Sequence, residues 1–223
     1  MSHSIAIDGP AGAGKSTIAK LLAKKMNYIY VDTGAMYRAM AVYFSKNGIN
    51  PDDEAAIDNA VKDVDINIVY SEGVQQVILN GENVTGLLRT EETGRMASKT
   101  SKYSSVRTKL VDLQRELARK TDVIMDGRDI GTVVLPDAFC KIYLTASSDA
   151  RAQRRYNELV EKGEKCNYDE IKADIESRDY QDMHREISPL KQADDAVLVD
   201  TSDMNIEQVV DELTKIINAK VNA

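Results

Sequence analysis

A phosphate-binding loop stands near the start of the sequence. The pattern G-x-x-x-x-G-K-[ST] is matched in full by Gly9, Pro10, Ala11, Gly12, Ala13, Gly14, Lys15 and Ser16. The glycines let the backbone fold around an oligophosphate with its N–H groups pointing inward. Lys15 then reaches the β- and γ-phosphates, and the Ser16 hydroxyl is placed to hold Mg²⁺. The sequence therefore predicts a site for a nucleoside triphosphate with Mg²⁺.

Further motifs along the chain are rich in arginine. They are D-T-G-A-M-Y-R at 32–38, D-G-R-D at 126–129, R-A-Q-R-R at 151–155, and a segment in which Arg178, Asp182 and Arg185 are spaced to share one helix face. A kinase needs such arginines, because it must hold a second anion opposite the triphosphate. A regulatory GTPase would need a guanine-reading N-K-x-D sequence, which the chain lacks. We therefore favour a small-molecule kinase.

Short apolar segments that alternate with helices must position these motifs. The expected strands are 5–7, 28–31, 123–125, 141–144 and 196–199. Helical spacing of apolar residues predicts helices over 16–26, 105–120 and 206–217. Such alternation predicts a five-stranded parallel sheet covered on both faces, which is a three-layer α/β fold. Ligands of these folds gather at the carboxyl ends of the strands, where the D-T-G and D-G-R-D motifs begin.

One stretch departs from the alternation. Residues 65–70, 74–79 and 82–84 have strand character with no helix between them, and Asn80-Gly81 is a hairpin dipeptide. We expect a small antiparallel insertion over 64–100, with a helix starting after Thr90. The kinase core would then comprise 1–63 and 101–223.

Composition restricts the partners of the chain. The 223 residues carry a net charge of −7, which argues against nucleic acid, and no apolar run approaches the ~20 residues of a membrane span. Cys140 and Cys166 form neither a disulfide framework nor a zinc site, so we expect a reducing, cytoplasmic setting. The chain enters its first strand directly, which leaves no room for a signal peptide. No heptad pattern demands an oligomer, so we expect a monomer.

Together, the motifs resemble those of nucleoside monophosphate kinases, and specifically of bacterial-type cytidylate kinases. The resemblance rests on G-P-A-G-A-G-K-S, D-T-G-A-M-Y-R, D-G-R-D-I-G-T-V-V-L-P-D-A, R-A-Q-R-R and R-D-Y-Q-D-M-H-R, which cover essentially the whole chain in order. It implies a P-loop kinase with a mobile lid over about 151–167. It also implies transfer of the γ-phosphoryl of MgATP to CMP or dCMP, giving CDP or dCDP, in pyrimidine nucleotide metabolism.

The resemblance further implies a role for each matching residue. ATP binding falls to the loop from Gly9 to Thr17 and to the lid residues Arg151, Arg154 and Arg155. The acceptor phosphate falls to Arg38, Arg128 and Arg185, the cytosine to Ser98, Arg107 and Asp129, and the ribose to Arg178 and Asp182. Thr33 and Asp126 complete the acceptor site, and Asp126 would also orient Mg²⁺ through water beside Ser16. Catalysis would rest on Lys15, Arg128 and Arg155.

Several alternatives stay open on the residues alone. Asp126 could be a helix N-cap, and the 178–185 segment or Arg107 could be solvated surface. Ala11 stands where many relatives carry a serine that can touch the acceptor, Ser16 stands where many carry glycine, and Thr33 replaces a frequent serine. The acceptor could be AMP, UMP or shikimate, or the chain could be a non-catalytic ATP-dependent switch.

Overall fold

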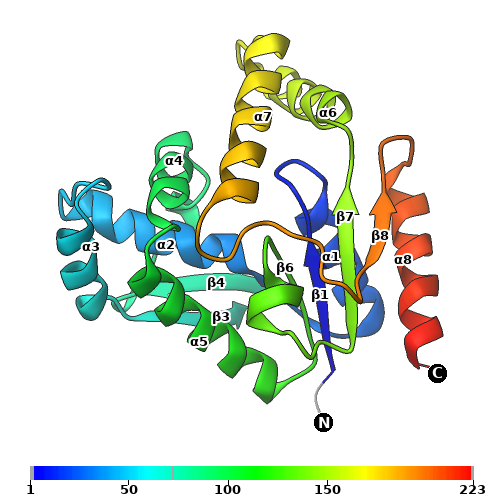
Figure 1. The fold of residues 1–223 in the computed structure, drawn as a ribbon, viewed down its shortest axis with the longest axis horizontal. Helices are drawn as coiled ribbons and strands as arrows, with labels where there is room; N and C mark the ends of the chain where they lie inside the picture. The colour runs from blue at the N-terminus through cyan, green and yellow to red at the C-terminus, as the bar shows by residue number, and fades with distance from the viewer. Residues whose placement is uncertain (1–2, 72, 222–223) are drawn as a thin grey trace.

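A parallel sheet forms the centre of the structure, a computed structural model that describes residues 3–71 and 73–221 (Figure 1). The strand order is β2-β6-β1-β7-β8, and every neighbouring pair is parallel. The strands are β1 (Ser4–Asp8), β2 (Ile29–Asp32), β6 (Val123–Gly127), β7 (Cys140–Thr145) and β8 (Val197–Asp200). The predicted five-stranded parallel sheet is confirmed, with ends that differ by one or two residues.

Successive residues of the central strands face opposite layers. Ile5 and Ile7 pack against α1 (Lys15–Met26) and α8 (Ile206–Val221). Ala6, between them, packs on the other face against α2 (Thr33–Lys46) and α5 (Ser104–Lys120). All three side chains are fully buried, as parallel strands covered on both faces require. The predicted three-layer α/β fold is therefore confirmed.

A second, smaller sheet is antiparallel and has the order β3-β4-β5. Its strands are β3 (Ile66–Ser71), β4 (Val74–Leu79) and β5 (Glu82–Asn83), preceded by α3 (Glu54–Ala60) and followed by α4 (Glu91–Thr100). Asn80 and Gly81 both have positive φ, as a hairpin turn of type I′ requires. The apolar side chains of this sheet share one core cluster with α2. That residues 64–100 form an insertion with a role in acceptor binding stays a prediction.

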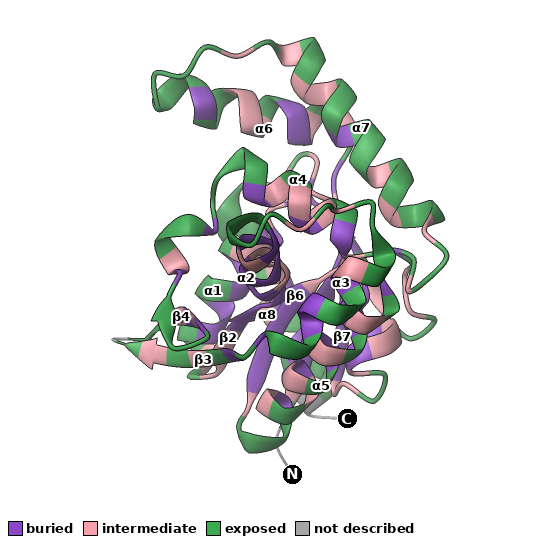
Figure 2. Ribbon diagram, turned by 90° about the vertical axis from the view of Figure 1, so that its left-hand side faces the viewer, coloured by how far each residue is buried: buried purple, intermediate pink, exposed green. Residues whose placement is uncertain are grey.

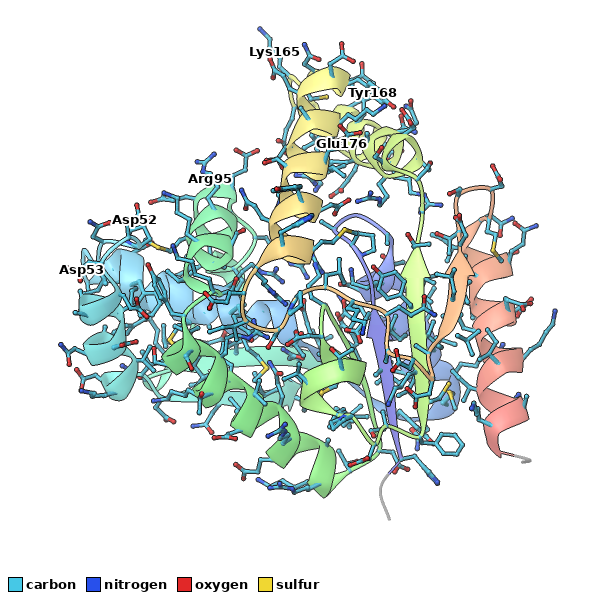
Figure 3. The ribbon with its side chains drawn as sticks, viewed as in Figure 1. Asp52, Asp53, Arg95, Lys165, Tyr168 and Glu176 are labelled. Carbon is cyan, nitrogen blue, oxygen red and sulfur yellow. The ribbon has the colours of Figure 1, made fainter. Side chains whose placement is uncertain are left out.

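A helical hairpin stands above the carboxyl ends of the central strands (Figure 1). It consists of α6 (Ser148–Glu161) and α7 (Tyr168–His184). Most of its surface is exposed, whereas the central strands are buried (Figure 2). Side chains join the start of α6 to α7: the Tyr168 hydroxyl lies 3.1 Å from Asp149 Oδ1, and Ser148 Oγ lies 2.9 Å from Glu176 Oε1 (Figure 3).

The end of α7 corrects one expectation. Arg185 was expected on the same helix as Arg178 and Asp182, but the helix ends at His184 and Arg185 is extended, with φ −65° and ψ 142°. The Asp182 carbonyl accepts a hydrogen bond of 2.7 Å from the Leu190 N–H, so the following loop caps the helix. Arg185 consequently turns toward the sheet.

Candidate active site

One cleft at the carboxyl ends of β1, β2 and β6 gathers both groups of predicted residues. It is lined from the loop side by Ala11, Gly12, Lys15 and Ser16. From the other side it is lined by every residue assigned to the acceptor, namely Thr33, Arg38, Ser98, Arg107, Asp126, Arg128, Asp129, Arg178, Asp182 and Arg185. Residues from five separate segments of the chain therefore face one space.

The phosphate-binding loop owes its shape to close backbone packing. Gly9 has φ 150°, and a Cβ there would lie 1.9 Å from the Leu144 carbonyl oxygen, so only glycine fits. Gly12 and Gly14 also have positive φ, and the second precedes α1 directly. Lys15, the first helical residue, is buried and donates a hydrogen bond of 2.7 Å to the Pro10 carbonyl. The loop's own carbonyl thus holds the ammonium group.

Burial and the nearby Arg128 guanidinium lower the pKa of Lys15 well below its ordinary value. A bound triphosphate would reverse this effect, because anionic oxygens favour the charged ammonium form. The described residues hold no other lysine lining this cleft. Lys15 is therefore suited to meet an anion.

Asp126 lies at the centre of a hydroxyl cluster. Its carboxylate accepts hydrogen bonds of 2.8 Å from Ser16 Oγ and from the Tyr30 hydroxyl, and its carbonyl accepts one of 2.6 Å from Thr33. Burial, followed by the charge of Asp32, raises the pKa of Asp126. A serine hydroxyl beside a carboxylate is a donor set that suits Mg²⁺, which keeps most of its waters. The described residues contain no cluster of three acidic, histidine or cysteine ligands.

Two carboxylates organise the arginines deeper in the cleft. Asp129 pairs with Arg107 through the nearly fully buried Arg107 Nη2, and Arg185 Nη2 lies 3.7 Å from its other oxygen. Asp182 accepts a hydrogen bond of 2.7 Å from Arg128 Nε and lies 3.8 Å from Arg185 Nη1. Each carboxylate therefore contacts two guanidinium groups. Arg178, which was assigned to the ribose with Asp182, is exposed and pairs with Asp174 at 3.8 Å, so its contact with the sugar stays a prediction.

Asp32, the first residue of the D-T-G-A-M-Y-R motif, is a further functional candidate to which the sequence alone assigned no role. Its carboxylate caps α2 through the Ala35 N–H at 2.8 Å and contacts Arg38 at 3.3 Å and Arg89 at 3.1 Å. Gln75 of β4 binds the Asp32 backbone at 2.8 Å. Asp32 directly follows the expected strand 28–31, and this place at the carboxyl end of a strand could have identified it as a site residue. Arg89 lies in the expected insertion, where no sequence pattern singles it out.

Two guanidinium nitrogens in the cleft are buried without a hydrogen-bond partner. They are Arg38 Nε and Arg185 Nη2. An unsatisfied buried donor is costly, and both side chains lie on the acceptor side of the cleft. Tyr37 also faces the cleft, with the Arg107 guanidinium 5.6 Å above its ring. These features favour an anionic ligand.

The three lid arginines lie outside the cleft lining and differ sharply in environment. Arg151 is buried and donates to the Ala11 and Ala146 carbonyls, both at 2.9 Å, and its Nη2 lies 2.6 Å from Asp179 Oδ2. Arg154 donates to the Thr201 carbonyl at 2.5 Å. Arg155 is half-buried and pairs with Glu158 at 2.9 Å. Their contact with ATP stays a prediction.

Comparison with known proteins points to one family. The family model described as cytidylate kinase matches residues 5–219. A cytidylate kinase of Leuconostoc mesenteroides is 51% identical over 221 residues, which cover 99% of each chain. A cytidylate kinase of Carboxydothermus hydrogenoformans is 49% identical over 216 residues, which cover 97% of each chain.

Solved structures of low identity support the fold alone. A shikimate kinase of Bacteroides thetaiotaomicron superposes with a TM-score of 0.51 at 14% identity, covering 97% of this chain and 98% of that one. Within the described ranges, no helix is both long and apolar enough to cross a bilayer.

Proposed function

The chain belongs to the cytidylate kinase family, and from that premise we propose how its cleft residues divide the work of the reaction. It is a phosphotransferase that moves the γ-phosphoryl group of ATP to CMP or dCMP, giving ADP and CDP or dCDP, in pyrimidine nucleotide metabolism. The observation that best supports the residue assignments is the pairing of Asp129 with Arg107 beside Arg185 Nη2, which has no hydrogen-bond partner among the described residues.

The acceptor phosphate binds Arg38, Arg128 and Arg185. Two of these side chains have an unpartnered nitrogen, Arg38 Nε and Arg185 Nη2, which phosphate oxygens can satisfy. Arg128 is held by Asp182 through Nε at 2.7 Å, so its orientation is fixed before the ligand arrives. Guanidinium groups are well suited to phosphate, because their planar forks match its oxygens.

The cytosine ring binds between Ser98, Arg107 and Asp129. Cytosine presents an amino donor at N4 where uracil presents an acceptor at O4, so a carboxylate accepts from cytosine and repels uracil. Asp129 is 5% exposed, and its pairing with Arg107 keeps it oriented. Arg107 can then donate to the N3 and O2 edge of the base.

The sugar binds Asp182, with Arg178 joining it from the same face of α7. In the structure the Asp182 carboxylate contacts Arg128 at 2.7 Å and Arg185 at 3.8 Å. We therefore assign Asp182 two tasks, which are to accept from a ribose hydroxyl and to orient the arginines that meet the phosphate. Thr33 and Asp126 lie between this site and the loop.

The triphosphate lies in the loop from Gly9 to Thr17, with Lys15 leaving the Pro10 carbonyl to contact the phosphate oxygens. Ser16 and Asp126, 2.8 Å apart, would hold Mg²⁺, Asp126 through water. Bound Mg²⁺ would neutralise charge on the phosphate oxygens. The lid, about 151–167, closes over ATP and brings Arg155 to the transferring group, while Arg151 and Arg154 complete the ATP site.

No strong general base is needed, because the attacking atom is already a phosphate oxygen. The residues act by position and by charge: Lys15 and Arg128 stabilise the transferring group, and Arg38 holds the acceptor in line. Closure of the lid only over bound nucleotides would keep water from the γ-phosphate. We further propose a cytoplasmic monomer that uses neither nucleic acid nor a membrane, in which 64–100 extends the acceptor-binding part of the core 1–63 and 101–223.

A panel of acceptors tests the proposal. ADP release from MgATP is measured with CMP, dCMP, UMP, AMP and shikimate, and with no acceptor. We expect CMP and dCMP to give the largest kcat/KM. Equal stimulation by UMP would contradict the roles of Asp129 and Arg107, and the absence of any stimulation would favour an ATP-dependent switch.

A further inference from the structure

Asp8 is a buried carboxylate that the mechanism above does not use. It is the last residue of β1, it directly precedes Gly9, and it is only 4% exposed. Its Oδ1 accepts the Ile130 N–H at 2.7 Å and its Oδ2 accepts the Gly131 N–H at 2.7 Å. These donors open the π-helical turn Ile130–Val134 that follows the D-G-R-D motif, 122 and 123 residues further along the chain. One side chain thus joins the ATP loop to the acceptor loop.

The fit around this carboxylate is tight. A Cβ at Gly131 would lie 3.3 Å from Asp8 Oδ2 and 3.1 Å from Lys141 Cδ, so the turn is pressed against both side chains. Strand register sets the same alignment, because Asp8 is the partner of Gly127 in the ladder between β1 and β6. The segment between Gly127 and Gly131 is therefore fixed at both ends, and Arg128 and Asp129 project from it into the cleft.

We propose that Asp8 is a positioning residue for phosphoryl transfer, whose ionised carboxylate holds the turn at Ile130 and Gly131 and so aims Arg128 and Asp129 at the acceptor. This role rests on the proposed function of the cleft. The ionised form is required because it accepts two N–H groups at once, one on each oxygen. A protonated carboxyl group carries a hydrogen on one oxygen, which makes that oxygen a weaker acceptor for its N–H group.

The surroundings of Asp8 make its ionisation sensitive to pH. Burial, opposed by the two N–H groups and reinforced by the charge of Asp129, raises the pKa of Asp8 to about 6. Lys15 acts in the opposite direction from the start of α1. From β7, Tyr143 responds to the charge of Asp8 and the Lys141 stem packs beside it. The group therefore titrates within a range that an enzyme assay can reach.

Asp8→Asn tests the proposal, because asparagine keeps the shape but presents an N–H₂ group to one of the donors. We expect kcat/KM for CMP to fall roughly 10- to 100-fold at pH 8, as small misplacements of catalytic groups do. The ratio of wild-type to variant kcat/KM should then shrink about tenfold by pH 5. With a pKa of about 6, the ionised fraction of Asp8 falls from nearly all to roughly a tenth over that interval. The titration of CMP itself is common to both proteins and cancels in the ratio.

Asp53→Asn is the matched control. Asp53 accepts the Ala56 N–H at 3.0 Å at the start of α3 and lies at the outer edge of the molecule, away from the cleft (Figure 3). Its variant should keep the wild-type kcat/KM at every pH. A ratio of wild-type to Asp8→Asn kcat/KM that stays near one, or that is raised by the same factor at all pH values, would overturn the positioning role. A wild-type protein that CMP does not stimulate would instead overturn the proposed function.

An NMR titration of the wild-type protein decides the matter if Asp8→Asn does not fold. The amide resonances of Ile130 and Gly131 should shift with a pKa of about 6, and the Arg128 Nε–H resonance should follow with the same midpoint. The Ala56 amide should show no step at that pH. Titration of the two amides without movement of Arg128 would leave Asp8 a structural cap and refute the proposal.

Discussion

Replacing Arg151 with methionine should lower the free energy of unfolding far more than the same change at Arg155. Both residues lie on α6 and both were assigned to ATP, but their surroundings differ. The Arg151 side chain is 6% exposed and holds Asp179, itself 14% exposed, at 2.6 Å. The Arg155 side chain is 41% exposed and pairs with Glu158 at 2.9 Å. Methionine keeps the aliphatic stem in each case and removes only the charge and its hydrogen bonds.

The expected magnitudes follow from these contacts. Arg151→Met leaves Asp179 without its ion-pair partner, and Asp179 Oδ1 is already unpaired. It also removes the hydrogen bonds of 2.9 Å that Arg151 donates to the Ala11 and Ala146 carbonyls. Breaking a buried pair from one side typically costs about 3–5 kcal/mol. Arg155→Met should cost only about 0.2–1 kcal/mol, because an exposed pair is screened and Glu158 keeps Lys162 at 2.6 Å.

Urea unfolding at pH 7, followed by circular dichroism, measures both free energies of unfolding. Activity at a temperature where both variants are folded then separates stability from chemistry, since Arg155→Met should lower kcat if its guanidinium meets the transferring phosphoryl group. Equal losses of stability in the two variants would refute the reasoning. So would a loss below about 1 kcal/mol for Arg151→Met, which would mean that water replaces the buried contacts without cost.

The remaining predictions concern single side chains. Lys15→Ala should lower kcat by about 10²–10³ in steady-state assays while the melting temperature stays unchanged. Asp129→Ala should reduce the preference for CMP over UMP in kcat/KM by roughly 5- to 150-fold. Asp182→Ala should weaken CMP binding by about 1.5–3 kcal/mol in calorimetry, with little effect on an ATP analogue. The free energy of unfolding of the wild type, relative to Asp8→Asn, should fall by about 2 kcal/mol from pH 4 to pH 7. The unfolded chain loses the Asp8 proton near 3.8 and the folded chain retains it to about 6.

The parts of the molecule that could be predicted are those encoded by contiguous residues. The phosphate-binding loop needs its glycines and Lys15 at fixed spacing, so the local sequence largely specifies the conformation of the loop. The alternation of Ile5, Ala6 and Ile7 between two helical layers follows from burial of both faces of a parallel strand. The Asn80-Gly81 turn likewise demands positive φ at adjacent residues, which few other pairs adopt.

The parts that could not be predicted depend on contacts between distant segments. Arg151 and Arg155 look alike in R-A-Q-R-R, and only the arrival of Asp179 and of the Ala11 carbonyl distinguishes a buried anchor from a surface residue. The end of α7 before Arg185 is set by a hydrogen bond from Leu190. Arg89 reaches the cleft because the small sheet packs on α2, which no local pattern specifies.

The central place of β1 in the sheet has a consequence for synthesis on the ribosome. This strand emerges well before its partners β6 and β7, which end at Gly127 and Thr145. Contacts this distant in sequence form slowly. The apolar β1 therefore has no strand partner until well over half of the chain has been made. Throughout that interval the nascent protein exposes an aggregation-prone segment. The element that binds the nucleotide is therefore translated before the strands that complete it, so the nucleotide site cannot form on the unfinished chain.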